Sequence, residues 1–172
     1  MLNLTKPSLE HQEAILTFRR EFLKVYDYVH GSNELNAFTD YGFRAWIHYV
    51  EAPAGTSWFG YEKVNDSTYL AWLDGKVVGI MHIRHQLSDI LLQRGGNVGY
   101  SVHPDYQGRG IASEMLKYAI GKLKSLGLER ILVTCSSQNA ASRAVIKKNG
   151  GVLENIIDTG NTSIERYWIA TT

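Results

Sequence analysis

The most informative segment of the chain reads Tyr106-Gln107-Gly108-Arg109-Gly110-Ile111-Ala112. Upstream, residues 98–102 (Val-Gly-Tyr-Ser-Val) are typical of a short buried strand, which Pro104 ends because proline cannot extend a ladder. Downstream, apolar residues recur at helical spacing as far as Leu123. The segment therefore predicts a strand, a glycine-rich turn and a helix that begins at or near Gly110.

A glycine-rich turn that opens a helix favours the binding of phosphate. The first backbone N–H groups of a helix have no partner inside it, and the helix dipole adds partial positive charge at the same end. We therefore expect this turn to bind a phosphorylated cofactor. The candidate cofactor-binding residues in it are Gln107, Gly108, Arg109, Gly110, Ile111, Ala112 and Ser113.

The residues of this turn fit one of three known phosphate-binding patterns. A dinucleotide-binding fingerprint needs a third glycine where Ser113 stands, and a P-loop needs a Gly-Lys-Ser/Thr sequence that is absent. Gln107, Gly110 and Ala112 instead fit the pattern Gln/Arg-x-x-Gly-x-Gly/Ala. That pattern resembles the pyrophosphate-binding segment of the GNAT superfamily of N-acetyltransferases, which use acetyl-coenzyme A. A nucleotide-binding domain unrelated to coenzyme A stays open as an alternative.

A second segment resembles the same superfamily. Residues 131–135 (Ile-Leu-Val-Thr-Cys) predict a strand, and residues 139–151 resemble the Asn-x-x-Ser helix that follows it in those enzymes. The resemblance implies that Asn139 and Ser142 contact the pantetheine and diphosphate of the cofactor. It covers residues 68–171 well and residues 1–67 only loosely.

The expected fold class is α/β (α+β): the GNAT fold, with a mixed, mostly antiparallel sheet of six to seven strands and helices on both faces. One domain is expected over residues 1–172, with 1–67 as the acceptor side and 68–171 as the cofactor-binding core. The strands expected from alternation and turn signals are 2–6, 68–73, 76–85, 98–102, 131–135, 152–158 and 164–170. Helices are expected from Ser8 to before Gly31, over 40–49, from near Gly110, and from Asn139, whereas residues 51–66 predict an irregular segment.

Composition narrows the class of protein. The chain has 172 residues, 44% of them hydrophobic, and a net charge of +1, so nothing favours nucleic acid or an acidic membrane surface as a partner. We expect a cytoplasmic protein, because no apolar run reaches the length of a membrane span, no signal pattern opens the chain, and Cys135 is the single cysteine. Cys135 is interpreted as a buried, inert thiol. No spacing of Cys and His predicts a metal site, and a homodimer is compatible with the sequence.

The resemblance also implies where the thioester lies. In the superfamily the sheet opens beside the strand equivalent to residues 98–102. Gly99 and Tyr100 would lie at that opening, and Ser101 and Val102 would lead towards the diphosphate. Two residues depart from the usual pattern: Asn97 stands where many relatives carry a glutamate base, and Ile146 stands where many carry a tyrosine acid.

Direct attack with proton loss through water is one possible mechanism, and catalytic side chains from elsewhere in the chain are the other. The candidates are His82, Arg84, His85, Tyr100, Ser101 and His103. His82 and His85 have opposite strand parity, so at most one of them faces the acceptor. We select His85, near the end of its strand, and Tyr100, although a histidine satisfied within the sheet is the simpler interpretation. His103 is expected to shape the turn before Pro104.

The sequence thus predicts an N-acetyltransferase that moves an acetyl group from acetyl-coenzyme A to the amine of a small molecule or peptide, by direct attack through a tetrahedral intermediate. The alternative is a catalytically weak GNAT fold that holds acyl-coenzyme A as a sensor or scaffold. The acceptor is not readable from the residues. The pair Trp58-Phe59 is the first candidate for the wall of its pocket.

Overall fold

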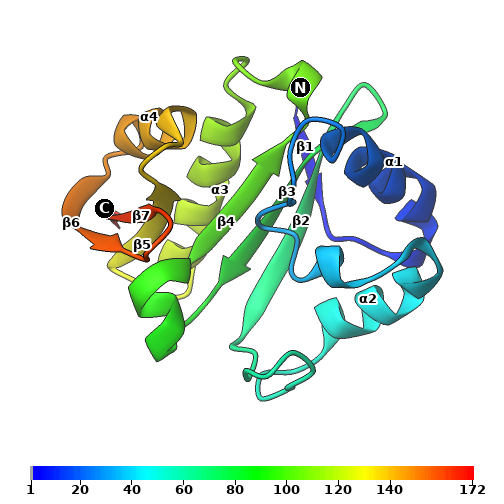
Figure 1. Ribbon diagram of the computed structural model, residues 1–172, viewed down its shortest axis with the longest axis horizontal. Coiled ribbons are helices and arrows are strands. Elements are labelled where there is room, and N and C mark those ends of the chain that lie inside the picture. The colour runs from blue at the N-terminus through cyan, green and yellow to red at the C-terminus, as the bar shows by residue number, and fades with distance from the viewer. Residues whose placement is uncertain (1) are drawn as a thin grey trace.

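The computed structural model describes residues 2–172, in which seven strands form two antiparallel sheets (Figure 1). The first sheet has the order β1 (Asn3–Thr5), β2 (Asp66–Leu73), β3 (Lys76–Arg84) and β4 (Val98–Val102). The second has the order β5 (Arg130–Ser136), β7 (Ser163–Ala170) and β6 (Val152–Asp158). Every strand pairing is antiparallel.

The helices cover both faces of the first sheet. α1 (Gln12–Phe22) and α2 (Phe43–Glu51) lie on one side of it. α3 (Ile111–Ser125) lies on the other side, and α4 (Ala140–Lys148) stands beyond it with the second sheet (Figure 1). Short helical turns occupy Leu9–His11, Leu35–Ala37, Asp40–Gly42, Leu91–Gly95 and Pro104–Tyr106.

The side chains of β2 and β3 alternate between the two faces of the sheet and contribute to a separate hydrophobic core on each face. Successive side chains of a strand point to opposite faces, so Leu70 and Ile80 pack against α1 and α2. Tyr69 and Met81 pack with α3 and the second sheet. Because helices cover both faces, the middle of each strand is apolar on both sides.

The single sheet expected from the sequence is divided between β4 and β5. At the start of β4 the N–H of Asn97 donates to the carbonyl of Leu132 (2.7 Å), and the N–H of Leu132 donates to the side-chain Oδ1 of Asn97 (2.8 Å). A side-chain oxygen therefore takes the place of the next backbone carbonyl. Among residues 2–172 no further ladder joins the two strands, so they part towards Tyr100.

The expected helix from Ser8 is also shorter than predicted. A short turn at Leu9–His11 precedes α1, which ends at Phe22, and residues 23–34 form an irregular connection. The reason is a close approach: a Cβ added to Gly31 would lie 2.3 Å from the carbonyl carbon of Gly99, so this connection passes directly over β4. The other expected elements are confirmed within a few residues, and residues 52–65 are irregular as predicted.

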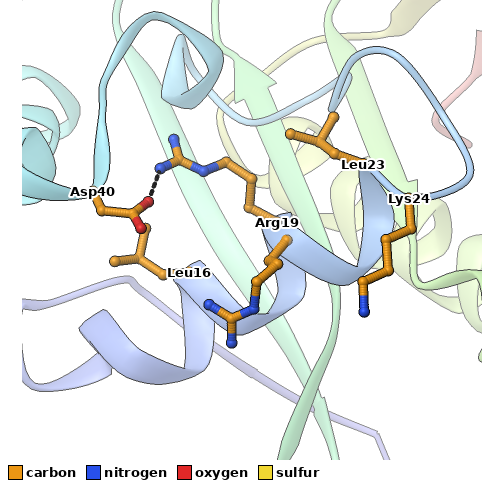
Figure 2. A pocket seen from close by; sticks show the side chains of 6 residues that line it. Leu16, Arg19, Leu23, Lys24 and Asp40 are labelled. Atoms are coloured by element: carbon orange, nitrogen blue, oxygen red, sulfur yellow. Dashed lines mark hydrogen bonds and ion pairs between the residues drawn. The ribbon is translucent and has the colours of Figure 1, made fainter.

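A buried arginine fixes the connection that leads to α2. Arg19 donates to the carbonyls of Leu35 (2.8 Å) and Phe38 (2.7 Å), and to Oδ1 of Asp40 (2.6 Å). Figure 2 shows the Arg19–Asp40 pair, in a hollow of about 350 Å³ over α1 that Leu16 and Lys24 also line. A buried guanidinium needs several acceptors, and Arg19 finds them in these two backbone carbonyls and Asp40. Arg19 therefore stabilises the backbone of this connection.

Candidate cofactor and acceptor site

The glycine turn before α3 exposes unpaired amides. Gly108 (φ +76°) and Gly110 (φ +80°, the N-cap of α3) both adopt the left-handed conformation that glycine tolerates. Within residues 2–172 no hydrogen bond has an amide of residues 108–113 as its donor; Glu114 is the first, and it donates to Gly110. The helix start predicted near Gly110 is confirmed, and its amides are available to a ligand.

The turn is held by side chains that the sequence assigned to the cofactor. Gln107 donates from Nε2 to the carbonyl of Val102 (3.0 Å) and accepts from the hydroxyl of Tyr26 (3.0 Å). The buried Ser113 accepts at Oγ from Asn149, the C-cap residue of α4 (3.1 Å). Gln107 and Ser113 therefore tie the turn to β4, to the connection after α1 and to the C-cap of α4. Ile111 is buried, Ala112 is half-buried, and Arg109 is exposed.

His103 ties the same turn to α1. Its Nδ1 accepts from the N–H of Asp105 (3.1 Å), so Nε2 is the ring nitrogen that donates to Glu21, 2.7 Å away. Lys76 also donates to that carboxylate (2.8 Å). These two hydrogen bonds, that of Lys76 first, lower the pKa of Glu21 to about 2. His103 thus shapes the turn, as the sequence predicts.

Three of the predicted site residues meet where β4 and β5 part. The hydroxyl of Tyr100 lies 3.1 Å from Oγ of Ser142 on α4. Asn139 is the N-cap of α4, and its Oδ1 accepts from the N–H of Ser142 (3.0 Å). Burial raises the pKa of Tyr100 to about 12, so the hydroxyl keeps its proton at neutral pH. Ser101 instead faces the other side of the sheet and donates to the carbonyl of His30 (2.6 Å).

The two positions that usually carry acid and base carry neither. Asn97 is buried, and its amide is fully used: Oδ1 accepts from Leu132, and Nδ2 donates to the carbonyl of Arg84 (3.0 Å). Ile146 is buried in the apolar core beneath α4. Both residues are structural.

A cavity of about 250 Å³ lies on the α1–α2 side of the sheet. Its wall comes from the connection after α1, the irregular segment after α2, strands β2 and β3, and the turn after β3. His82 lines it and pairs in register with Gly99 of β4. The cavity is therefore adjacent to the strand where the thioester is expected.

His82 forms a buried pair with Asp66 in this cavity. Nε2 of His82 lies 2.7 Å from Oδ2 of Asp66. Because a carboxylate only accepts, the neutral ring donates from Nε2 and keeps Nδ1 as its acceptor. Burial, with the charge of Arg84 second, lowers the pKa of His82 to about 4, so the ring is neutral at physiological pH.

His85 lies elsewhere. Its Nε2 is 2.8 Å from Oγ of Ser67, and it lines a different hollow with Lys6 and Leu128. The two histidines have opposite strand parity, and they line different hollows. Which of them lines the cavity near β4 depends on the covering helices, and it is His82. Asp66 was missed because the sequence placed it at the end of the irregular segment.

Strained backbone forms one wall of the cavity. Asn33 (φ +51°) and Glu34 (φ +70°) are both left-handed although neither is glycine. The indole N–H of Trp46 holds them by donating to the carbonyls of Ser32 (3.1 Å) and Asn33 (3.0 Å). Glu34 accepts from the hydroxyl of Tyr61 (2.5 Å). Such strain persists where the surroundings enforce it, and it is concentrated at functional sites.

The predictions for the Trp58-Phe59 pair and for Cys135 have different outcomes. Trp58 and Phe59 pack on Tyr49, with ring centroids 5.3 Å and 4.9 Å away, and it is Tyr49 that lines the cavity. The pair therefore supports the wall from behind. Cys135 is buried, and burial raises the pKa of its thiol to about 11, which agrees with the inert thiol that the sequence predicts.

The comparison with known families matches this architecture. Residues 22–151 match the model of the acetyltransferase (GNAT) family. The chain belongs to the GNAT family. The expected GNAT fold, with its open junction between β4 and β5 and its glycine turn before α3, is thereby confirmed.

Individual proteins similar to this GNAT chain are also acetyltransferases by name or share its fold. It is 35% identical over 81 residues to the uncharacterized N-acetyltransferase YnaD of Bacillus subtilis (strain 168), a match that covers 42% of this chain and 46% of the relative. The matched region thus spans about half the length of that protein. RimJ of Mycobacterium smegmatis, solved with a CoA-disulfide, has a TM-score of 0.75 at 18% identity and covers 98% of this chain and 81% of its own.

A third similar protein is yncA, a putative acetyltransferase of Salmonella typhimurium solved with its cofactor acetyl-CoA. It has a TM-score of 0.66 at 14% identity and covers 99% of this chain and 94% of its own. At these identities the two solved structures establish the fold of the GNAT chain. Over residues 2–172 no helix has the length and apolarity that a membrane crossing requires, and no group of three or more His, Cys, Asp or Glu is placed to hold a metal ion.

Proposed function

We propose that this GNAT domain, residues 1–172, is an N-acetyltransferase that transfers an acetyl group from acetyl-coenzyme A to the amine of a small molecule or a peptide. The unpaired amides of residues 108–113, next to the opening between β4 and β5, carry this proposal. Family membership and the coenzyme A ligands named for RimJ and yncA support it. A cytoplasmic location and a homodimer stay predictions.

The cofactor would run along β4 towards α3. Its diphosphate binds the open amides of Gly108 to Ser113, with the guanidinium of Arg109 nearby. Its pantetheine arm lies between β4 and α4, beside Tyr100, Asn139 and Ser142. Its thioester carbonyl meets backbone N–H near Gly99 and Tyr100. Ser101 and Val102 contribute backbone rather than side chains, because both side chains are buried. The reaction as proposed assigns no role to a metal ion.

The acceptor amine would enter from the cavity beside β4. As its nitrogen bonds to the thioester carbon, it loses a proton to Nδ1 of His82, directly or through water, while Asp66 orients the ring. The imidazole of His82 can accept this proton despite its lowered pKa, because the amine nitrogen of the acceptor becomes far more acidic once it has bonded to the thioester carbon. The carbon–sulfur bond then breaks, and the sulfur leaves as a thiolate.

Tyr100 would stabilise that thiolate. Its hydroxyl, with a pKa of about 12, stays protonated and donates a hydrogen bond to the sulfur. Full proton transfer from so weak an acid to a thiolate is uphill, since a free thiol has a pKa of about 8.5. The proton on the released coenzyme A therefore comes from water.

One observation favours a second candidate, an acyl-coenzyme A sensor or scaffold of low activity. Asn97 and Ile146 occupy the positions of the usual acid and base, and both are buried in structural contacts. Such a protein would bind acyl-coenzyme A without turning it over.

The test has two stages. Calorimetry with coenzyme A, ATP and NAD side by side should give tight binding of coenzyme A alone, and preference for either nucleotide refutes the cofactor assignment. Release of free thiol from acetyl-coenzyme A is then followed with a panel of amines. Binding of acetyl-coenzyme A without release by any amine supports the sensor instead.

A further inference from the structure

The guanidinium of Arg84 presents an unsatisfied edge to the acceptor cavity. NH1 donates to the carbonyls of Gly95 (2.9 Å) and Gly96 (3.2 Å). Within residues 2–172, Nε and NH2 have no hydrogen-bond partner, although a guanidinium offers five donors. NH2 lies 3.8 Å from the place of a Cβ on Gly99, so this edge is next to the middle of β4. Arg84 lines the cavity together with His82.

No carboxylate neutralises Arg84 directly. Among the described residues no carboxylate oxygen lies within 4.0 Å of its guanidinium. The two acids whose charges act on it, Asp66 and Glu34, have partners of their own. Asp66 pairs with His82 and lies 3.7 Å from Lys63, and Glu34 accepts from Tyr61. Arg84 is half-buried, and a cation partly removed from water without an anion beside it is costly, so a ligand that supplies the anion binds with advantage.

We propose that the acceptor is a small amine that carries a carboxylate within a few bonds of its nitrogen, as an amino acid does, and that Arg84 binds this carboxylate. The inference rests on the proposed function, of which it names the acceptor class. Arg84 is a specificity-determining residue of that site. The planar fork of Nε and NH2 matches the two oxygens of a carboxylate.

Spacing supports an acceptor with the two groups close together. His82 and Arg84 are two residues apart on one strand, so their side chains share a face about 7 Å apart along it. An amine held at Nδ1 of His82 and a carboxylate held at Arg84 therefore belong to one small molecule. The cavity, at about 250 Å³, accommodates a ligand of that size. Asp66 and Glu34, which also line the cavity, favour the ammonium end before it loses its proton.

The decisive comparison uses matched pairs of amino acids and their carboxamides. Amidation removes the carboxylate and lowers the pKa of the amine, so intrinsic reactivity alone favours the carboxamide. We expect the opposite order, with kcat/KM about 10- to 100-fold higher for the acids, the effect typical of a charge-assisted pair. Equal or better turnover of the carboxamides overturns the inference while leaving the acetyltransferase in place.

A second readout needs no turnover. N-acetyl amino acids and N-acetyl amino acid amides are titrated by calorimetry into the protein saturated with coenzyme A. We expect binding of the carboxylates only. If coenzyme A binds but no carboxylate does, the inference fails by itself. If coenzyme A does not bind, the proposed function fails first, and a remaining preference for carboxylates would still support Arg84.

Variants of Arg84 test whether this residue causes the preference for carboxylate acceptors. Arg84→Gln should abolish the preference for carboxylates, so that kcat/KM for an amino acid and for its carboxamide agree within about threefold in the variant, because no cation is left to bind the carboxylate. Arg84→Lys keeps the charge without the fork and should retain part of the preference, which guards against misfolding of the glutamine variant. Arg94→Gln, at an exposed arginine of the adjoining turn, is the matched control and should change nothing. A preference for carboxylates that survives Arg84→Gln contradicts the assignment.

Discussion

The side-chain oxygen of Asn97 accepts the backbone N–H of Leu132 at 2.8 Å, and this contact is where β4 and β5 part. A backbone carbonyl in its place would continue the ladder. Instead the amide ends it and donates its own N–H to the carbonyl of Arg84 on β3. Asn97, which stands where many relatives carry a glutamate base, therefore lies at the point where β4 and β5 part.

Replacing Asn97 should destabilise the fold. Asn97→Ala leaves two buried backbone groups, the N–H of Leu132 and the carbonyl of Arg84, without partners, so we expect a loss of about 2–4 kcal/mol in the free energy of unfolding. Urea denaturation measures it. Asn3→Ala, at an exposed position of β1, is the control and should cost under about 0.5 kcal/mol. A loss of similar size in both variants would show that Asn97 does not hold the junction.

Strain at the glycine turn should weaken coenzyme A binding. A Cβ at Gly110 meets nothing within 4 Å, but φ of +80° is costly for alanine. Gly110→Ala should therefore lose about 1 kcal/mol of stability and bind coenzyme A about tenfold more weakly, as measured by calorimetry. Gly121→Ala, in the middle of α3 with equal space around it, should gain up to about 1 kcal/mol and bind normally. Unchanged affinity in the first variant counts against the amide site.

The choice between the two histidines can be measured directly. His82→Gln should lower kcat/KM at least about 100-fold, the size expected for a general base, with little change in the affinity for acetyl-coenzyme A. His85→Gln should stay within about threefold, because His85 contacts Ser67 in a different hollow. His48→Gln, on the exposed face of α2, controls for loss of an imidazole. The reverse order of effects would favour His85, the histidine selected from the sequence.

The buried histidine also makes stability depend on pH. The pKa of His82 falls from 6.5 to about 4 on folding, so the unfolded chain binds this proton first as the pH drops. Stability should therefore fall between pH 6.5 and about 4, by as much as about 3 kcal/mol from this group. Urea denaturation at several pH values in that window gives the free energy of unfolding as a function of pH. This free energy should fall less steeply with decreasing pH for His82→Gln than for His48→Gln. Identical slopes would mean that His82 is not held neutral by burial.

Removing one hydroxyl should slow the release of thiol. Tyr100→Phe keeps the ring between β4 and α4 but loses the donor beside Ser142. We expect kcat to fall about 10- to 100-fold while coenzyme A binds within about threefold, since a charge-assisted hydrogen bond to the leaving sulfur is lost. Tyr41→Phe, at a fully exposed tyrosine, should have no effect. A normal kcat in Tyr100→Phe would leave Tyr100 as a structural residue.

Errors in the sequence analysis came from contacts between distant segments. The apolar pattern continues through Tyr26, which predicted a longer first helix, but Tyr26 lies beyond the end of α1 and donates to Gln107 instead. The parity of β3 separated His82 from His85 without revealing which face the acceptor approaches. The cavity lies on the face that carries His82 because α1 and α2 cover that face, a tertiary arrangement that the strand pattern does not contain.

The sequence by itself determined the strand, the glycine turn and the helix at residues 98–123, because helical spacing and the left-handed conformation of glycine depend on neighbouring residues alone. It also determined the GNAT family. Only the tertiary structure decided that Asp66, His82 and Arg84 share one cavity, and that Asn97 ends the ladder to β5. Those relationships join residues far apart in the chain, and only packing brings them together.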